Sequence, residues 1–582
     1  MIRGSDEASG IMKTMNPMRS VTCLAAILFV LSSLSPVKAG EASSWSRDDA
    51  AHLLRRAGFG ATPSQIDHTY GLGREAAVEY LISGKLPDGA EAPFAPVDLE
   101  PFKLTDPGLD MRQGPEKFFE VEKFRIWWID RMVRTDRPLE EKMTLFWHGL
   151  FTSGLRETKI PRWLIDQNLL FHKEAIGNYK RLTREIIHDP AMLKYLNNDE
   201  NVRGKPNENL ARELMELFTM GEGNGYSEKD IPQVARALTG LTPRPPRLGG
   251  TGAIMRPMMH DNGEKTIFGH TGNYGPDDVV NLIFDRPEPA NHLAERLWNF
   301  FGGPDASEAD LAPVAAALRD HNWDVAPALR VMFNSRAFYS DKNKHAVIKS
   351  PIELEVSTLR LLEEPPEPRI LFAATNAAKV MGEELLQPPN VKGWPGGEHW
   401  ITSSAIYTRY NVASAMAAGT YGFFGGGLGV LRGKEGNGNK AAAAINPAAA
   451  GKVNEPADQQ LTSAPPEESK KELKKQNKQA INRQERQKVL EELAAMPPLP
   501  PPAALVVTKK LFPQLAGKEA TADEVVDAAV ARFLQQPLPT DKKKVLSDAL
   551  GEDSIRLGQP ASDRRVRQMI GLLMSTPEYQ TE

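Results

Sequence analysis

Apolar residues recur along most of the chain at the three- and four-residue spacing of helices. One stretch places a single apolar stripe on Met143, Phe146, Trp147, Leu150 and Phe151. Leu210, Leu214, Leu217 and Phe218 repeat this spacing. Alternating patterns typical of strands are few. The pattern therefore predicts a mostly α-helical protein, built as one large multi-helix domain.

Capping signals divide this pattern into separate helices. Thr62 and Thr521 are each followed three residues later by Gln or Glu, and Ser46 precedes early aspartates as a helix N-cap. Such pairs predict helix starts, because the two side chains satisfy free N–H groups of the first turn. Gly58 and Gly240 follow predicted helices and indicate their ends.

Residues 241–275 break the helical pattern and are rich in Gly and Pro. Within them, Asn262-Gly263 stands between two partly apolar arms, and Asn-Gly is a strong signal for a tight hairpin turn. We therefore expect a short β-hairpin in this long loop, with its turn at Asn262-Gly263.

The N-terminus resembles a signal for export. Lys13 and Arg19 precede the apolar run 21–34, and small residues follow up to Ala39. This run is shorter than the ~20 residues that span a membrane. We expect a signal peptide over residues 1–39, a periplasmic or secreted mature protein, and no membrane span after cleavage. Cys23 is the only cysteine, so the mature chain depends on its apolar core for stability.

Composition divides the remaining chain into three parts. Residues 40–421 form the predicted helical main domain, and residues 422–502 form a Gly/Ala-rich, charged and Pro-rich insertion. Helical signals return over residues 503–582, which we expect to pack on the main domain. The basic stretch 470–488 is either a solvated helix or a contact for an anionic polymer. A net charge of −4 argues against a nucleic-acid partner.

The predicted helix over residues 207–223 carries an unusual density of charge. Arg212 stands four residues from both Glu208 and Glu216, and such pairs on a surface helix contribute ~0.2–0.5 kcal/mol each. Pairing explains these charges but not Asn207 and Asn209, which are either helix caps or ligand-binding residues.

These charges also allow a catalytic hypothesis. If the hairpin folds over this helix, one cleft would contain His148, Arg212, Glu213, Glu216, His260 and Asp261. Glu213 would act as a base, the histidines would move protons, and Arg212 would bind an anionic group. The alternative is a buried ion-pair network that locks the hairpin to a helix. No His-Glu-x-x-His or cysteine pair predicts a metal, and no cofactor is indicated.

The segment 387–405 contains glycines, prolines and two tryptophans. Trp394 and Trp400 offer flat apolar faces for a sugar ring, and Lys392 could meet an anionic substituent. Alternatively, the tryptophans fill the core and the glycines turn the chain.

Several stretches together resemble one bacterial family, described only as domain of unknown function 1800. They occur in order as "HLLRRAGFGATPSQID", "KMTLFWHGLF", "NENLARELMELFTMGEG", "YSEKDIPQVARALTG", "HDNGEKTIFG" and "QPPNVKGWPGGEHWITSSA", with a weaker echo in "LLMSTPEYQ". The resemblance implies an exported, largely helical protein. Relatives are often encoded beside a secreted sulfatase-like family, which implies a secreted sulfatase-like partner. The insertion 422–502 departs from the family pattern.

Two classes of function remain open from the sequence. A non-catalytic binding or scaffolding protein that works with a secreted partner is slightly favoured, because no known catalytic signature is present. The alternative is a hydrolase that acts on extracellular material, anionic or polysaccharide, by Glu/His acid–base chemistry.

Overall fold

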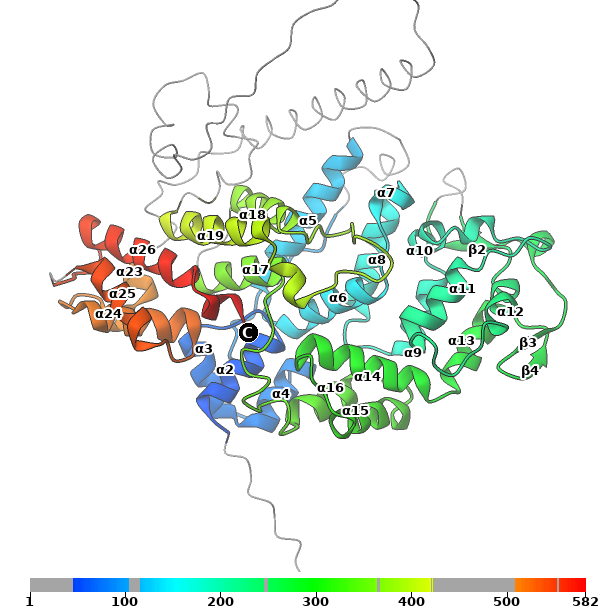
Figure 1. Cartoon of the computed structure of the whole chain (residues 1–582), viewed down its shortest axis with the longest axis horizontal. Coiled ribbons are helices and arrows are strands. Elements are labelled where there is room, and N and C mark those ends of the chain that lie inside the picture. The colour runs from blue at the N-terminus through cyan, green and yellow to red at the C-terminus, as the bar shows by residue number, and fades with distance from the viewer. Residues whose placement is uncertain are drawn as a thin grey trace, which may run out of the picture. The chain divides into compact units, whose positions relative to one another are not determined.

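The computed structural model describes residues 45–103, 116–244, 250–363, 367–419, 421, 508–551 and 554–582. Helices account for nearly all regular structure in these ranges, which confirms the prediction of a mostly α-helical protein (Figure 1). The predicted signal peptide and the predicted insertion lie outside the described residues. Within the described ranges, no helix has the length and apolarity required to span a membrane.

The chain begins with a long series of helices. They are α2 (Arg47–Arg56), α3 (Pro63–Leu72), α4 (Arg74–Ser83), α5 (Glu116–Arg134), α6 (Pro138–Leu150), α7 (Leu155–Thr158), α8 (Pro161–Lys173), α9 (Tyr179–Ile187), α10 (Pro190–Tyr195), the 3₁₀ helix η2 (Asn198–Glu200), α11 (Asn209–Glu213), the π-helix η3 (Leu214–Thr219) and α12 (Asp230–Ala237). The strands follow as β1 (Leu241–Pro243), β2 (Ala253–Met255), β3 (Lys265–Ile267) and β4 (His270–Gly272), with η5 (Pro257–Met259) after β2.

A second series of helices completes the described chain. They are α13 (Pro276–Phe284), α14 (Glu288–Phe301), α15 (Glu308–Asp320), α16 (Val325–Asn334), α17 (Pro351–Leu362), α18 (Pro368–Val380), η6 (Gly397–Trp400), α19 (Ser403–Ala418), α23 (Thr508–Leu511), η9 (Pro513–Leu515), α24 (Ala522–Ala529), the π-helix η10 (Val530–Leu534), α25 (Thr540–Leu550), α26 (Pro560–Met574) and η11 (Pro577–Gln580).

Capping boxes start three helices where the sequence predicts them. Ser46, Thr62 and Thr521 each accept a hydrogen bond from the backbone N–H three residues on, and the partner side chain returns a bond to the cap. In α2 the two N···O distances are 3.1 and 3.0 Å. These interactions involve only residues within one turn of each other, so the local sequence specifies where the helices begin.

The strands form two antiparallel pairs, β1 with β2 and β3 with β4. The expected hairpin exists, but the predicted turn at Asn262-Gly263 is wrong. The turn lies at Phe268 and Gly269, whose φ values of +50° and +83° suit a tight hairpin. Gly263 instead donates its N–H to the Asp261 carboxylate at 2.8 Å, which closes a separate turn before β3.

The C-terminal helices share a core with the central helices. In Figure 1, α26 lies beside α19, and the two helices pack against each other. Gly571 of α26 permits close approach, because a Cβ there would lie 3.3 Å from the Ala417 Cβ. Trp128 of α5 and Phe533 of η10 belong to the same apolar cluster. The segment 508–582 is therefore part of the main hydrophobic core.

Helix α6 is buried on nearly every side, so its polar residues need partners inside the protein. Lys142 is fully buried, and its Nζ lies 2.5 Å from a Glu353 oxygen and 3.2 Å from a Glu582 oxygen. Arg56 of α2 donates to the same Glu582 oxygen. We call these four residues, Arg56, Lys142, Glu353 and Glu582, the buried ion cluster. It joins α2, α6, α17 and the last described residue.

The buried ion cluster predicts a large effect for Lys142→Met. The substitution leaves two buried carboxylates with one cation fewer, and breaking such a buried pair costs about 3–5 kcal/mol. Urea denaturation should show this loss in the free energy of unfolding. Lys543→Met is the matched control, because Lys543 pairs with Asp527 at 2.7 Å on an exposed surface and should change stability by less than about 1 kcal/mol. Equal losses in the two variants would contradict the assignment.

Candidate functional site

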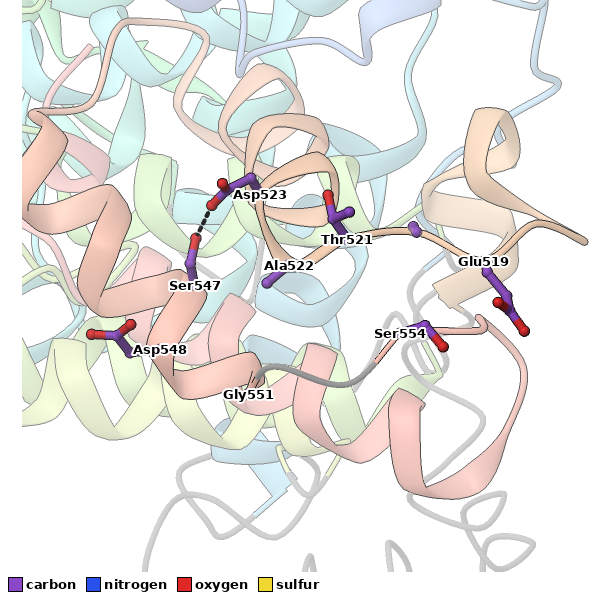
Figure 2. Close-up of a pocket in the computed structure, with 9 residues that line it drawn as sticks. Glu519, Thr521, Ala522, Asp523, Ser547, Asp548, Gly551 and Ser554 are labelled. Carbon is purple, nitrogen blue, oxygen red and sulfur yellow. Dashed lines mark hydrogen bonds between the residues drawn. The ribbon is translucent and has the colours of Figure 1, made fainter.

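A hollow of about 680 Å³ lies between the start of α24 and the end of α25 (Figure 2). Its polar groups are engaged locally: Ser547 donates to Asp523 at 2.6 Å, and Thr521 belongs to the capping box of α24. None of the predicted site residues lines it.

A cavity of about 220 Å³ lies against the buried ion cluster, and Glu353 belongs to both. Its walls come from α6, from α14, from the chain around the start of α17, from Glu383 and from the loop that carries the two tryptophans. The lining residues are Leu145, Phe146, Gly149, Arg296, Asn299, Phe300, Val347, Ile348, Ser350, Glu353, Glu383, Trp394, Pro395, Gly396, Gly397 and Trp400. Segments far apart in sequence thus form one concave site that combines aromatic and ionisable side chains.

Two carboxylates of this cavity have opposite electrostatic environments. Burial raises the pKa of Glu383 to about 7, even though the Ile352 N–H donates to it at 2.8 Å. Burial also opposes the charge on Glu353, but Lys142 and Arg56 outweigh it and hold the pKa of Glu353 at about 2. One carboxyl therefore exchanges its proton near neutral pH while the other stays charged. Such divergence is typical of acid–base pairs in active sites.

The loop that carries Trp394 and Trp400, here called the tryptophan loop, is held against the end of α6 by close backbone contact. Gly393 has φ +79°, and a Cβ there would lie 2.5 Å from the Gly149 carbonyl oxygen. Thr152 donates its hydroxyl to the Val391 carbonyl at 2.7 Å. Only glycine combines this backbone conformation with this approach, so the loop path depends on Gly393.

The loop places both predicted tryptophans at the cavity. Trp400 is buried, and Trp394 is partly buried with an indole N–H that has no hydrogen-bond partner within the described chain. Lys392 points away from this cavity toward the 207–223 segment, where its Nζ lies 3.7 Å from Glu222.

His148 lies beneath the same loop and is fully enclosed. Its Nε2 accepts the Leu386 N–H at 3.1 Å, and its ring lies 5.2 Å from the Trp394 ring. Burial lowers the pKa of His148 to about 3, so the ring is neutral at physiological pH. The structure thus places His148 where it positions the loop.

The 207–223 segment is less regular than a single helix. It runs as α11 to Glu213 and then as the π-helix η3 to Thr219, before Gly221 at φ +88°. Asn207 accepts the Asn209 N–H at 3.0 Å and so closes the turn before α11. A π-helix forms where a side-chain position must be shifted relative to an α-helix, and is frequent at functional sites.

The charges on this segment form a surface network. Arg212 pairs with Glu216 at 3.0 Å, with Glu228 at 3.2 Å and with Glu208 at 3.6 Å. Glu213 is half-buried, and its pKa is raised by burial and by the nearby Glu216. These contacts match the interpretation of the charges as surface helix pairs.

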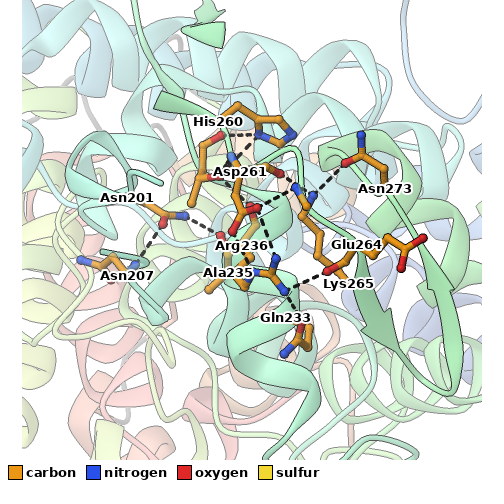
Figure 3. A network of polar contacts seen from close by, with 12 residues as sticks. Asn201, Asn207, Gln233, Ala235, Arg236, His260, Asp261, Glu264, Lys265 and Asn273 are labelled. Carbon is orange, nitrogen blue, oxygen red and sulfur yellow. Dashed lines mark hydrogen bonds and ion pairs between the residues drawn. The ribbon is translucent and has the colours of Figure 1, made fainter. Parts of the chain in front are cut away.

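His260 and Asp261 belong to a separate network at α12 (Figure 3). His260 donates from Nδ1 to the Thr239 carbonyl at 2.8 Å. Asp261 accepts two bonds from Arg236, at 2.8 and 3.2 Å, and these bonds lower the pKa of Asp261 to about 2. Lys265 donates to the Asp261 carbonyl at 2.5 Å. The network ties the chain before β3 to α12.

The predicted catalytic residues therefore lie in three separate groups: His148 beneath the tryptophan loop, Arg212 with Glu213 and Glu216 on the 207–223 segment, and His260 with Asp261 at α12. In the ranges that the structure covers, no hydrogen bond or ion pair joins His148, Glu213 and His260 to one another. The same ranges contain no group of three His, Cys, Asp or Glu side chains placed to hold a metal ion. Their catalytic roles stay predictions.

Sequence reasoning missed Glu353, Glu383 and Arg296 as site residues. A signal for the first existed: Lys142 interrupts an apolar helix, and a buried lysine requires a carboxylate partner. Glu383 and Arg296 carry no local signal, because only tertiary contacts bring them to the cavity. Four of the sequence stretches quoted for the resemblance nevertheless reach this region, through Arg56, Lys142, Trp394 and Tyr579.

Comparison with known proteins identifies the family. The family model "Protein of unknown function (DUF1800)" matches residues 52–581, so the chain belongs to this family. No curated protein matches the chain, and no solved structure does.

The loop geometry predicts different effects for two glycine substitutions. Gly393→Ala should displace the loop from α6 and lower the melting temperature by several degrees, because its Cβ meets the Gly149 carbonyl. Gly396→Ala is the matched control, since Gly396 also has positive φ but has no atom within 4 Å of the added Cβ. It should cost only about 1 kcal/mol of backbone strain. Thermal unfolding of both variants tests the contact, and indistinguishable melting temperatures would contradict it.

Glu383 predicts a pH-dependent effect on stability. Its pKa is about 7 in the folded protein and ~4.3 in the unfolded chain. Protonation of Glu383 therefore stabilises the fold, and this contribution is fully present when the pH is below the pKa of the unfolded chain. This contribution is lost as pH rises through 7. At about pH 4, Glu383→Gln should have the same melting temperature as the wild type. At about pH 8.5, its melting temperature should be about 2–5 °C higher than that of the wild type. A constant difference across this pH range would exclude the assignment.

Proposed function

We propose that this protein is exported, that it binds the end of an extracellular glycan in the 220 Å³ cavity, and that it cleaves the glycan by acid–base hydrolysis. The observation that carries this proposal is the pair Glu353 and Glu383, one charged and one protonated near neutral pH, on the wall of a cavity lined by two tryptophans. Export is supported by the sequence pattern of residues 1–39.

The size and lining of the cavity favour a small ring-shaped ligand. Sites for drug-sized molecules have ~300–1,000 Å³, so this cavity has room for about one sugar ring. Trp394 and Trp400 supply apolar faces for the ring, while Ser350 and Asn299 line the wall with polar groups for its hydroxyls. An end-on mode follows, in which one terminal ring enters and the remaining chain stays outside.

The two carboxyl groups then divide the chemistry. Glu383 in its protonated form donates to the leaving glycosidic oxygen as the bond breaks. Glu353, held charged by Lys142, stabilises the positive charge that develops on the sugar ring. Water completes the hydrolysis, and its proton restores Glu383.

A non-catalytic binding protein is the second candidate, and one observation favours it. Both carboxylates already bond to the first turn of α17: Glu353 accepts the Ser350 N–H at 2.7 Å, and Glu383 accepts the Ile352 N–H. In this alternative they are structural caps, the cavity holds the glycan, and a secreted sulfatase-like partner performs the chemistry. The basic stretch 470–488, outside the described residues, would contact an anionic polymer.

Hydrolysis of nitrophenyl glycosides by the purified full chain tests the proposal. Glu383→Gln should lower kcat by about 10²–10⁴-fold and leave the binding constant nearly unchanged, because it removes the proton donor but keeps an acceptor for Ile352. The wild-type kcat should fall as pH rises above about 7. Glu519→Gln, at the open hollow of Figure 2, is the control.

Three results separate the candidates. Loss of hydrolysis in Glu383→Gln, with hydrolysis retained in Glu519→Gln, supports the proposed enzyme. Glycan binding by the wild type without hydrolysis of any linkage supports the binding protein. Full activity in Glu383→Gln contradicts the assigned acid–base role.

A further inference from the structure

We infer that the ligand of this cavity carries a carboxylate or sulfate group, bound by Arg296. The inference rests on the proposed glycan site and specifies its substrate class as an acidic sugar, either a uronic acid or a sulfate ester. The residues that carry it are Arg296 and Asn299 on α14.

Arg296 is a guanidinium without a partner at the cavity wall. It is partly buried, and burial lowers its pKa. Within the described chain it has no hydrogen-bond or ion-pair partner. Among the described carboxylates, only that of its exposed neighbour Glu295 affects the pKa of Arg296. A guanidinium that is partly withdrawn from water without compensating bonds loses hydration that nothing in the protein replaces. A ligand anion would supply the missing bonds.

Other enclosed arginines of this protein show what Arg296 lacks. Arg56 bonds to Glu582 and to the Phe301 carbonyl at 2.8 Å. Arg125 bonds to Glu122 at 2.5 Å and to the Leu385 carbonyl at 2.9 Å. Arg409 bonds to Gln580 at 2.9 Å and to the Lys349 carbonyl at 2.8 Å. Each of these three arginines thus has at least two protein partners, whereas Arg296 faces a cavity without a partner in the described chain.

A further donor lies at the same wall. Asn299 stands three residues after Arg296, one turn along α14, so both reach the same side of the helix. Guanidinium and amide donors together suit the several oxygens of a carboxylate or sulfate, which Arg binds through two parallel bonds.

The charges around the cavity tolerate such an anion. Lys142 and Arg56, which belong to the buried ion cluster, balance the negative charge of Glu353. Glu383 is protonated below about pH 7 and then adds no negative charge. The anion therefore meets an unpaired cation without strong opposition from either carboxyl group.

Calorimetric titration of the full chain tests the inference with three probes: glucuronate, glucose and inorganic sulfate. Glucuronate should bind at least about tenfold more tightly than glucose, as expected for one charge-assisted interaction. Arg296→Gln should abolish this preference and leave glucose binding unchanged. Arg319→Gln is the matched control, because Arg319 lies on the exposed side of α15 away from the cavity lining. Unchanged melting temperatures establish that both variants fold.

Each outcome separates the inference from the proposed function. Equal binding of glucuronate and glucose, unaffected by Arg296→Gln, overturns the acidic class and leaves the glycan site standing. Sulfate binding that is lost in Arg296→Gln, without any sugar binding, supports the anion site and removes the glycan assignment. Sulfate binding that survives Arg296→Gln is an adventitious ion only and overturns the inference. Absence of binding by all three probes overturns both.

Discussion

The structure depends on one buried lysine. Lys142 lies on a helix that is buried on nearly every side, without exposure to water, between Glu353 and Glu582. A buried charge is tolerated only when opposite charges surround it, so α6 can pack only where α17 and residue 582 supply their carboxylates. Arg56 adds a second cation from α2. The requirement for charge balance therefore brings together four segments that are distant in the sequence.

This requirement also creates the candidate site. Glu353 belongs both to the buried ion cluster and to the cavity wall, and α6 supplies both Lys142 and the surface on which the tryptophan loop rests. His148, on the same helix, accepts the amide of Leu386 at the base of the loop. The buried ion cluster and the candidate site thus share the same contacts, and part of the polarity of the cavity follows from Glu353, which belongs to both. Glu383 and Arg296 line the same cavity but do not belong to the buried ion cluster.

The sequence predicted the features that depend on local interactions. The mostly helical class and the capping boxes at Ser46, Thr62 and Thr521 follow from residues within one turn of each other. The predicted turn at Asn262-Gly263 is wrong because of a contact from outside the loop. Arg236 binds the Asp261 carboxylate, which also accepts the Gly263 N–H, and the hairpin turn lies instead at Phe268 and Gly269. Residue type alone suggests a ligand role for the two tryptophans, with core packing as the alternative, whereas Arg296 and Glu383 reach the cavity through tertiary packing that no local pattern encodes.

The central claim is that the buried ion cluster positions the tryptophan loop and hence the cavity. Hydrogen exchange of the full chain with Glu582→Gln tests it most directly, because Glu582 contacts Lys142 and Arg56 but does not line the cavity. The account predicts that amides of residues 385–400 exchange faster than in the wild type, while those of α13 keep their rates. Unchanged exchange over residues 385–400 would show that the loop is held independently of the cluster and would contradict the account.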